Sequence, residues 1–306
     1  MKLSRRKFIV SSSLSVAGTM LLSNEIFAGS NIAKVNVGMQ LYSVRDEMAK
    51  DPLNTLEQLA KMGYRNVEHA NYVDRKFYGY SASEFKKILN GLGMKMPSGH
   101  TVLTDKHWDA AKKDFTDEWK YTVDDAATVG QKHVISPYLD EKLRGNYDDM
   151  LSFLNVFNKC GELCKKSGMK FGYHNHDFEF KESLNGKMIY DIILEQTDPA
   201  LVTQQMDIGN MYNGGGRPME LLKKYPGRFE SMHVKDEIEA EKKEGVTEKY
   251  ESTVLGKGIV PVKEVVAQAR KTGGTTEFII EQESYQGKTP LESLKENLSI
   301  MKGWGY

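Results

Sequence analysis

The residues best suited to chemistry in this sequence are histidines and carboxylates that follow short apolar runs. The clearest case is the stretch FGYHNHDFEF at residues 171–180, where His174 and His176 end an apolar run and Glu179 follows them. Imidazole and carboxylate groups bind divalent metals and transfer protons near neutral pH. A strand that ends in such residues is typical of a site at the carboxyl edge of a parallel sheet, where α/β proteins bind ligands.

Five other apolar runs also end in ionisable side chains. These are Glu68 with His69, His100, Asp207, His233 followed by Lys235, and Glu281 with Glu283. One such residue alone is usually an ordinary polar strand terminus. Six strand ends of this kind predict a site, because closing a sheet into a barrel brings the ends of its strands within reach of one another.

Four of these residues, His174, Asp207, His233 and Glu281, form a natural set of metal ligands. Their nitrogen and oxygen donors suit Mn²⁺, Zn²⁺, Fe²⁺ or Co²⁺. A metal held in this way would bind adjacent oxygens of a sugar, polarise a carbonyl and acidify the neighbouring C–H. The alternative is a polar rim that binds a sugar through hydrogen bonds without a metal.

The elements that must position these residues alternate from Lys34 onward between short β-type runs and amphipathic helical patterns. Strands are predicted at residues 35–41, 66–70, 95–100, 133–138, 170–175, 201–207, 229–234 and 277–283. Helices are predicted at residues 51–62, 83–92, 109–129, 148–167, 218–224, 262–271 and 289–301. Eight strands that alternate with helices predict a single-domain (β/α)₈ TIM barrel. The charged segment 236–257 is too polar for a core and is predicted to be a long loop over the barrel mouth.

The net charge indicates which classes of partner the protein binds, and the cysteine spacing indicates a structural role for both cysteines. The 42 basic and 42 acidic residues cancel, so no electrostatic footprint indicates nucleic acid or an anionic membrane. We therefore expect a small, neutral substrate. The two cysteines, Cys160 and Cys164, lie one helical turn apart, and we expect them to pack in a core.

The N-terminal 28 residues have the features of an export signal. The twin arginines Arg5 and Arg6 precede an apolar run at residues 8–22 and a small-residue cleavage site that ends at Ala28. We predict a twin-arginine signal at residues 1–28, a folded domain at residues 29–306, a periplasmic location and no membrane insertion after cleavage. Passengers of such signals are generally exported folded, often with a cofactor already bound, which favours a metal.

The ordered strand ends resemble those of the xylose isomerase-like TIM barrel family, also called the sugar phosphate isomerase/epimerase family, which includes inosose dehydratase. The motifs are EHANY (68–72), SGHT (98–101), YHNHDFEF (173–180), MDIGN (206–210), MHVKDE (232–237) and IIEQESY (279–285). They cover nearly the whole of residues 29–306, in order. The resemblance implies one divalent metal at the mouth of the barrel, held by side chains of strands five to eight. By position these are His174, Asp207, His233 and Glu281.

One departure from the family pattern bears on the reaction. In the epimerases of this family the strand-five ligand is a glutamate that also acts as one of two acid/base carboxylates, and here His174 takes its place. The YHNH-type branch resembles enzymes that act on 3-keto sugars, so we expect β-elimination from a 3-keto-glycoside. Candidate bases are His176 or Glu68, and candidate acids are His100 or Lys235. Glu179, Glu283 and Asn210 are candidate substrate-binding residues, and Glu179 could also replace the missing carboxylate.

Three alternatives remain open at this stage. The enzyme could be a sugar isomerase or epimerase, or the protein could bind sugar in the periplasm without catalysis. A nuclease is disfavoured, because that chemistry needs a basic groove. At individual residues, Glu68 and Lys235 could form a salt bridge with each other, and His100 could orient a metal ligand.

Overall fold

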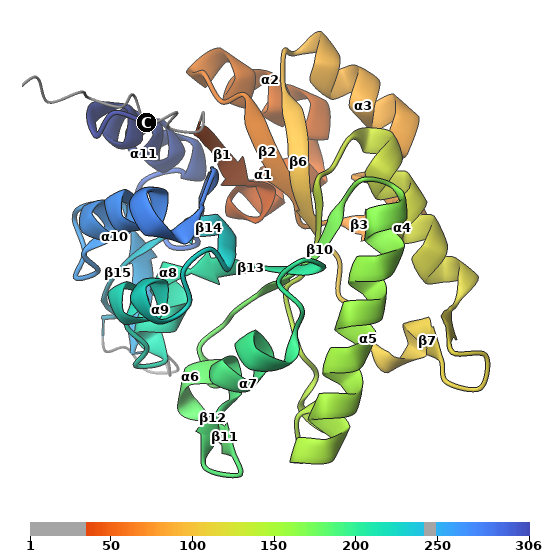
Figure 1. The fold of residues 1–306 in the computed structure, drawn as a ribbon. Coiled ribbons are helices and arrows are strands. Elements are labelled where there is room, and N and C mark those ends of the chain that lie inside the picture. The colour runs from red at the N-terminus through yellow and green to blue at the C-terminus, as the bar shows by residue number, and fades with distance from the viewer. Residues whose placement is uncertain (1–34, 242–248) are drawn as a thin grey trace, which may run out of the picture. The chain divides into compact units, whose positions relative to one another are not determined.

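Eight parallel strands form a closed barrel in a computed structural model that describes residues 35–241 and 249–306 (Figure 1). Strands that follow one another in the chain are neighbours, and the last pairs with the first. The strands are β1 (Asn36–Gln40), β2 (Asn66–His69), β6 (Lys95–His100), β9 (His133–Ser136), β10 (Lys170–His174), β13 (Val202–Asp207), β14 (Phe229–Val234) and β17 (Glu277–Ile280). The predicted (β/α)₈ barrel is therefore confirmed. The predicted signal segment, residues 1–28, lies outside the described residues.

Helices connect the strands and cover the outside of the barrel. Their starts follow from local sequence: Ser81 and Glu84 form a reciprocal cap at the start of α3, and Thr289 and Glu292 do the same for α11. The helices are α1 (Arg45–Lys50), α2 (Pro52–Met62), α3 (Ala82–Gly91), α4 (Asp117–Val129), α5 (Tyr147–Lys166), α6 (Phe178–Lys181), α7 (Ile189–Gln196), α8 (Ile208–Asn213), α9 (Pro218–Lys224), α10 (Val262–Gln268) and α11 (Pro290–Gly303). Short single turns occur at Leu41–Val44, Asp105–His107, Glu141–Leu143 and Ala269–Gly273.

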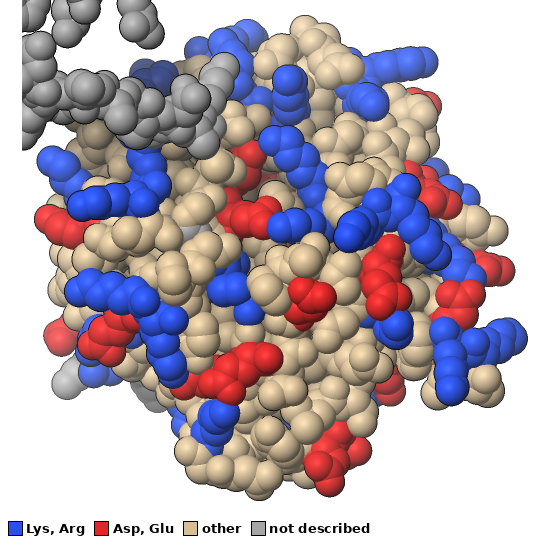
Figure 2. All heavy atoms as spheres, in the orientation of Figure 1, with Lys and Arg blue, Asp and Glu red and all other residues tan. Residues whose placement is uncertain are grey.

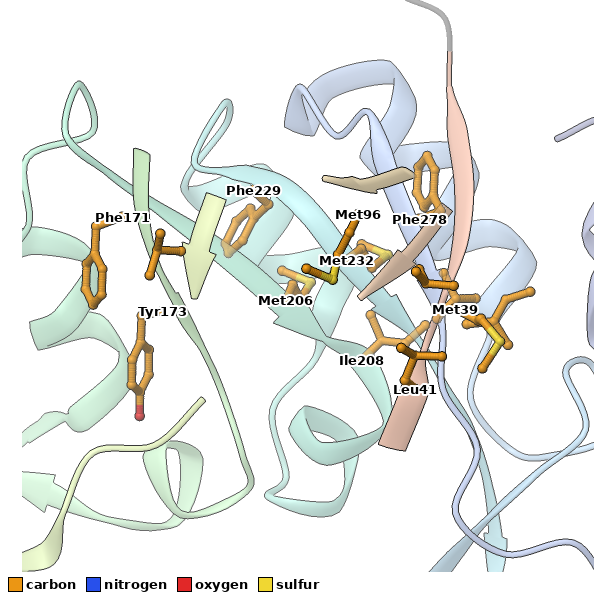
Figure 3. Close-up of a cluster of buried hydrophobic side chains, with 14 of the residues drawn as sticks. Met39, Leu41, Met96, Phe171, Tyr173, Met206, Ile208, Phe229, Met232 and Phe278 are labelled. Atoms are coloured by element: carbon orange, nitrogen blue, oxygen red, sulfur yellow. The ribbon is translucent and has the colours of Figure 1, made fainter. Parts of the chain in front are cut away.

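The hydrophobic core lies between the strands and these helices (Figure 3). Phe171 and Tyr173 on β10 pack against Phe157 of α5, with ring centroids 5.1 and 5.6 Å apart. Met206, Met232 and Phe278 are fully buried on β13, β14 and β17. Cys160 and Cys164 are buried on α5, as expected of packing residues, and the indole N–H of Trp119 donates to Cys160 Sγ at 3.1 Å. Alternate residues of each strand thus anchor the helices.

The other face of the strands points into the barrel and is polar near the carboxyl ends. Gln205 on β13 donates to Glu68 on β2 at 2.8 Å, although these strands are not neighbours, so the bond crosses the barrel interior. Glu68 and Gln205 are fully buried. Gly172 on β10 leaves room for this interior, because a Cβ there would lie 2.4 Å from Ile135 Cδ1. The barrel thus holds a polar layer directly beneath its mouth.

Two sequence predictions of local structure are wrong. Helix α4 begins at Asp117 instead of residue 109, because Asp109 accepts from two following backbone N–H groups and so turns the chain into the hairpin β7 (Trp108–Asp109) and β8 (Asp114–Phe115). The segment predicted as a loop at 236–257 contains the paired strands β15 (Asp236–Glu239) and β16 (Tyr250–Thr253). Asp236 is buried there because the N–H groups of Gly256, Gly258 and Val260 donate to its carboxylate.

Two further small sheets lie outside the barrel, in segments that follow β2 and β10. They are the three-stranded sheet of β3 (Tyr72–Val73), β4 (Lys76–Phe77) and β5 (Tyr80–Ser81), and the pair β11 (Ser183–Leu184) and β12 (Lys187–Met188). Acidic and basic side chains are intermixed over the face drawn in Figure 2. Within residues 35–241 and 249–306, each helix is too short or too polar to cross a membrane.

Candidate functional site

A cavity of about 530 Å³ opens at the carboxyl ends of the barrel strands. Its size is that of a small-molecule site. Residues from several strand ends and their following loops line it, namely Tyr42, Ala70, His100, Val102, Pro137, Tyr138, His174, His176, Asn210, Glu281 and Glu283. Three of the six ionisable strand ends, those that carry His100, His174 and Glu281, therefore line this cavity.

Donor atoms of three predicted metal ligands, Asp207, His233 and Glu281, form one compact group beside this cavity, and His174 groups with His100 and His233. Asp207 Oδ2 lies 3.9 Å from His174 Nε2 and 3.8 Å from His233 Nδ1. His233 Nδ1 lies 3.1 Å from Glu281 Oε2. The donors of Asp207, His233 and Glu281 all lie within 4.8 Å of one another. The strands β10, β13 and β14 and the end of β17 each contribute one of these residues.

This donor set fits a divalent metal ion. Donors bonded to one ion at about 2.0–2.2 Å lie roughly 3 to 3.5 Å apart in octahedral or tetrahedral shells, close to the separations seen here. Asp207 Oδ2 is a buried carboxylate oxygen without a hydrogen-bond partner among the described residues. Such an oxygen is costly to bury alone and is well placed to receive a cation. Two imidazoles and two carboxylates suit Mn²⁺, Zn²⁺, Fe²⁺ or Co²⁺.

Hydrogen bonds from the buried polar layer set the orientation of both imidazoles. His233 Nε2 lies 2.6 Å from Glu68 Oε1, so it donates there and turns Nδ1 toward Asp207 and Glu281. His174 Nδ1 lies 3.0 Å from Gln205 Oε1. Because the Gln205 amide nitrogen donates to Glu68, its oxygen accepts from His174, which leaves His174 Nε2 free to face Asp207. Each imidazole thus presents one nitrogen to the proposed ion.

Opposing charges balance this buried centre. Burial raises the pKa of Asp207. Burial also opposes ionisation of Glu281, but Lys235 and His233 hold the pKa of its carboxyl well below the usual range. Burial disfavours the imidazolium of His233, yet Glu281 and Glu68 raise its pKa to about 10. Lys235 Nζ lies 3.5 Å from Glu281 Oε2 and 4.0 Å from Asp207 Oδ2. The positive charge of Lys235 therefore lies next to both carboxylates of the site.

Two histidines of the cavity wall are candidates for proton transfer. His176 is largely buried, its Nδ1 has no hydrogen-bond partner among the described residues, and burial lowers the pKa of its imidazole to about 4. It is therefore neutral at pH 7 and able to accept a proton. His100 also lines the cavity, and its Nε2 lies 2.7 Å from Gln205 Oε1 and 3.1 Å from Glu68 Oε1.

Two carboxylates lie elsewhere than their proposed roles require. Glu68, a candidate base, is fully buried beneath the cavity and accepts from Gln40, Ser98, Gln205 and His233. Glu179, a candidate substrate ligand and second carboxylate, is fully buried behind the wall. It accepts from the Tyr173 hydroxyl at 2.6 Å and the His176 N–H, and burial raises its pKa to about 7. Neither carboxylate is part of the cavity wall formed by the described residues.

The remaining candidates lie near the cavity in different ways. Asn210 and Glu283 line it. Lys235 is buried beside it, pairs with Glu283 and donates to Asn210 Oδ1 at 3.3 Å. Lys235 thus pairs with Glu283, Glu281 and Asp207, so the salt bridge considered between it and Glu68 is not the pairing that forms. Among residues 35–241 and 249–306, those that line the cavity do not include Lys235.

Sequence reasoning missed three residues of the site. Gln205 orients His174 and His100, and its position two residues before Asp207 on one strand was a usable signal, because alternate strand residues share a face. Tyr42 lines the cavity from the turn Leu41–Val44 after β1, and Tyr138 lines it from the loop after β9. Aromatic residues in loops carry no periodic signal, so these two positions could not be singled out.

Comparisons with known proteins agree with this architecture. The family model described as xylose isomerase-like TIM barrel matches residues 56–304. The chain is 27% identical to the inosose dehydratase of Clostridium botulinum over 60% of its own length and 64% of that protein, so it spans a little under two thirds of this relative. It is 26% identical to an inosose dehydratase of Bacillus anthracis over 76% of this chain and 75% of that protein.

A solved structure extends the match to almost the whole chain. A sugar phosphate isomerase/epimerase from Parabacteroides distasonis superimposes with a TM-score of 0.73 at 25% identity, covering 92% of this chain and 97% of that one. The resemblance seen in the strand-end motifs is therefore confirmed at the level of the family and the fold.

Proposed function

Because this chain belongs to the xylose isomerase-like TIM barrel family, we propose that it is a divalent-metal-dependent carbohydrate enzyme that eliminates the C1 substituent of a 3-keto-glycoside. His174, Asp207, His233 and Glu281 would hold the ion. When bound there, the ion would withdraw electron density from neighbouring sugar oxygens and acidify the C–H beside a ketone. Its relatives named inosose dehydratase support elimination as the reaction class, since a dehydratase eliminates water.

The observation that carries this proposal is the one-sided placement of carboxylates in the cavity. Glu281 and Glu283 both come from the end of β17, whereas His174 and His176 occupy the wall at the end of β10. Glu179, the carboxylate that could have restored a pair, accepts from Tyr173 behind that wall. Epimerisation needs an acid and a base on opposite faces of one carbon. Among the described residues, the histidine wall does not offer the second carboxylate that the epimerases use.

The side chains divide the proton transfers of an elimination. His176 accepts the C2 proton, the C1–O bond breaks, and the electron pair of the C2–H bond forms the C1–C2 double bond. The departing oxygen takes a proton from His100, which lines the cavity as Lys235 does not. The products are the free aglycone and an unsaturated 2-hydroxy-3-keto sugar, so atoms and electrons balance without an oxidant. Lys235 offsets the charge of Glu281 and Glu283.

The proposal is tested by following a 3-keto-glycoside in D₂O by NMR, with the protein loaded in turn with Mn²⁺, Zn²⁺, Co²⁺ or Fe²⁺. We expect release of the aglycone and an enone signal. His176→Ala should lose this turnover while retaining the metal. An intact glycoside that carries deuterium at an inverted carbon would instead establish an epimerase. Binding without any chemical change, across a panel of glycosides and their 3-keto forms, would leave a sugar-binding protein.

We further propose that the enzyme works in the periplasm, from the twin-arginine pattern of residues 1–28. The change Arg5→Lys with Arg6→Lys should leave the uncleaved precursor in the cytoplasm. Fractionation with an antibody to the folded domain reads this out. Mature protein outside the cytoplasm in the double variant would indicate the general secretory route.

A further inference from the structure

A second cavity of about 620 Å³ lies beside the candidate active site. Its walls come from the hairpin that follows β2, the loop that follows β6 and the first turns of α4. Val102 lines both cavities, so the two share a wall and open side by side at the same end of the barrel. The mouth is thus larger than one monosaccharide ring held at the proposed metal ligands requires.

Exposed apolar side chains are concentrated in these two cavities. Seven large hydrophobic side chains are exposed among the described residues, and five of them line one cavity or both, namely Tyr42, Val73, Val102, Tyr121 and Tyr138. The two others, Leu53 and Ile259, lie elsewhere on the surface. Apolar surface gathered around a polar site usually marks the place where a ligand lies.

The wall of the second cavity is held in place by a buried carboxylate. Asp125 on α4 accepts from Arg75 Nε at 3.0 Å, Arg75 Nη2 at 2.9 Å and the Tyr72 hydroxyl at 2.7 Å. The Arg75 guanidinium lies over the Tyr121 ring, 4.3 Å from its centroid. Arg75 reaches this position through a tight hairpin turn in which it and Asp74 both have positive φ. An aromatic and polar surface is therefore fixed before any ligand arrives.

We propose that this second cavity binds a second sugar ring, so that the substrate is a 3-keto-disaccharide whose leaving group is itself a sugar. The inference rests on the proposed elimination for the ring at the metal ligands. A sugar presents C–H faces that pack on tyrosine rings such as Tyr121, and hydroxyl groups that donate to an exposed carboxylate such as that of Glu118, which also lines this cavity.

The test measures binding apart from turnover. The metal-loaded protein is titrated calorimetrically with methyl β-glucoside and with glucose disaccharides of each linkage. We expect at least one disaccharide to bind about tenfold more tightly than the methyl glucoside. Tyr121→Ala should weaken that disaccharide about 3- to 10-fold, the value of one aromatic contact, and leave methyl glucoside binding unchanged. Tyr121 and Ile259 are equally exposed, at 45%, so Ile259→Ala is the matched control and should change neither affinity.

Several results would overturn the inference. These are equal affinities for every disaccharide and the methyl glucoside, or a Tyr121→Ala variant that weakens both alike or neither. Tighter binding of 4-nitrophenyl β-glucoside than of any disaccharide would replace the sugar with an aromatic leaving group. NMR of a 3-keto-disaccharide separates this inference from the reaction itself. Disaccharide binding that depends on Tyr121, without elimination, would keep the second sugar site and refute the lyase.

Discussion

Replacing Glu68 with glutamine separates its two possible roles, a base that touches substrate and a buried group that orients His233. The carboxylate is fully buried and accepts from four side chains, namely Gln40 and Gln205 at 2.8 Å, Ser98, and His233 at 2.6 Å, and His100 Nε2 lies 3.1 Å away. All its hydrogen-bonding capacity is thus in use, and it is not part of the cavity wall built from the described residues. We therefore expect Glu68→Gln to act through the metal.

The magnitude follows from the bonds that change. Glutamine keeps one acceptor oxygen, which can still receive the His233 N–H, but its amide nitrogen then meets the Gln205 amide, another donor. The bond to His233 also loses its charge assistance, which roughly halves its strength. Removing a carboxylate that orients a metal-bound histidine typically weakens metal binding about 10- to 100-fold, or about 1.4 to 2.8 kcal/mol. The two opposed donors should also lower the free energy of unfolding by about 1 to 3 kcal/mol.

The assay is a metal titration followed by kinetics at saturating metal. Glu68→Gln should bind Mn²⁺ or Zn²⁺ about 10- to 100-fold more weakly than the wild type and recover most of its kcat when the metal is in excess. Ser98→Ala is the matched control, because it removes one donor to Glu68 and leaves the contact with His233 intact. Its metal affinity should stay close to that of the wild type.

The opposite pattern would refute this reasoning. If Glu68→Gln holds metal as tightly as the wild type but loses its kcat at every metal concentration, Glu68 is the base. The cavity of the working enzyme would then have to extend to Glu68, and the assignment of His176 as the base would be wrong.

Three further predictions follow from single contacts. Asp207→Ala should release the metal, because an incomplete shell binds far more weakly, and full occupancy by elemental analysis would remove Asp207 from the ligand set. Gly161→Ala should destabilise the fold by about 1 to 3 kcal/mol, because its Cβ would lie 2.6 Å from the Leu201 carbonyl oxygen, whereas Gly91→Ala at an open helix position should be neutral or stabilising; thermal unfolding gives both signs. The hydrogen bond from His133 lowers the pKa of Glu230 to about 2, so its contribution of about 1 to 2 kcal/mol is present above pH 4.5 and is lost as pH falls toward 2. The gap in unfolding free energy between wild type and Glu230→Gln should therefore close over that range.

The fold could be predicted because the barrel strands and their helices have regular sequence signals. All eight predicted strands overlap barrel strands, since apolar runs followed by glycine-terminated helices repeat along the chain. The errors occurred where side chains compete with regular structure. Asp109 accepts from backbone N–H groups and delays the start of α4, and Asp236 is buried because it accepts from three backbone N–H groups, which hydropathy does not represent. The short helix α7 (Ile189–Gln196) was missed because it begins after Met188, which makes no side-chain cap, so the sequence carries no start signal there.

The candidate site was predictable only in part, because residue types at strand ends carry no information on depth. Asp207, His233 and Glu281 meet, and His174 lies 3.9 Å from Asp207, because their strands are neighbours in the barrel. Glu68 has the same kind of position in the sequence, yet its side chain is buried in the barrel interior, where other side chains donate hydrogen bonds to it. Whether a strand-end carboxylate faces the cavity or the layer beneath it depends on strand register, and this is fixed only when the barrel closes.

The buried polar residues beneath the site are better explained by a role in orienting the site's histidines than by a role in stabilising the barrel. TIM barrels normally fill this interior with branched aliphatic side chains, and here Gln40, Glu68, Ser98, Gln205 and Ser231 occupy it instead. Buried polar groups gain little stability over apolar packing even when every bond is made. These groups instead fix the orientation of two imidazoles. Glu68 binds one nitrogen of His233 and Gln205 binds one nitrogen of His174, which turns the other nitrogen of each ring toward Asp207. A stable barrel alone does not need that arrangement, whereas the proposed metal site would, because ligand imidazoles are held in orientation by their second nitrogen.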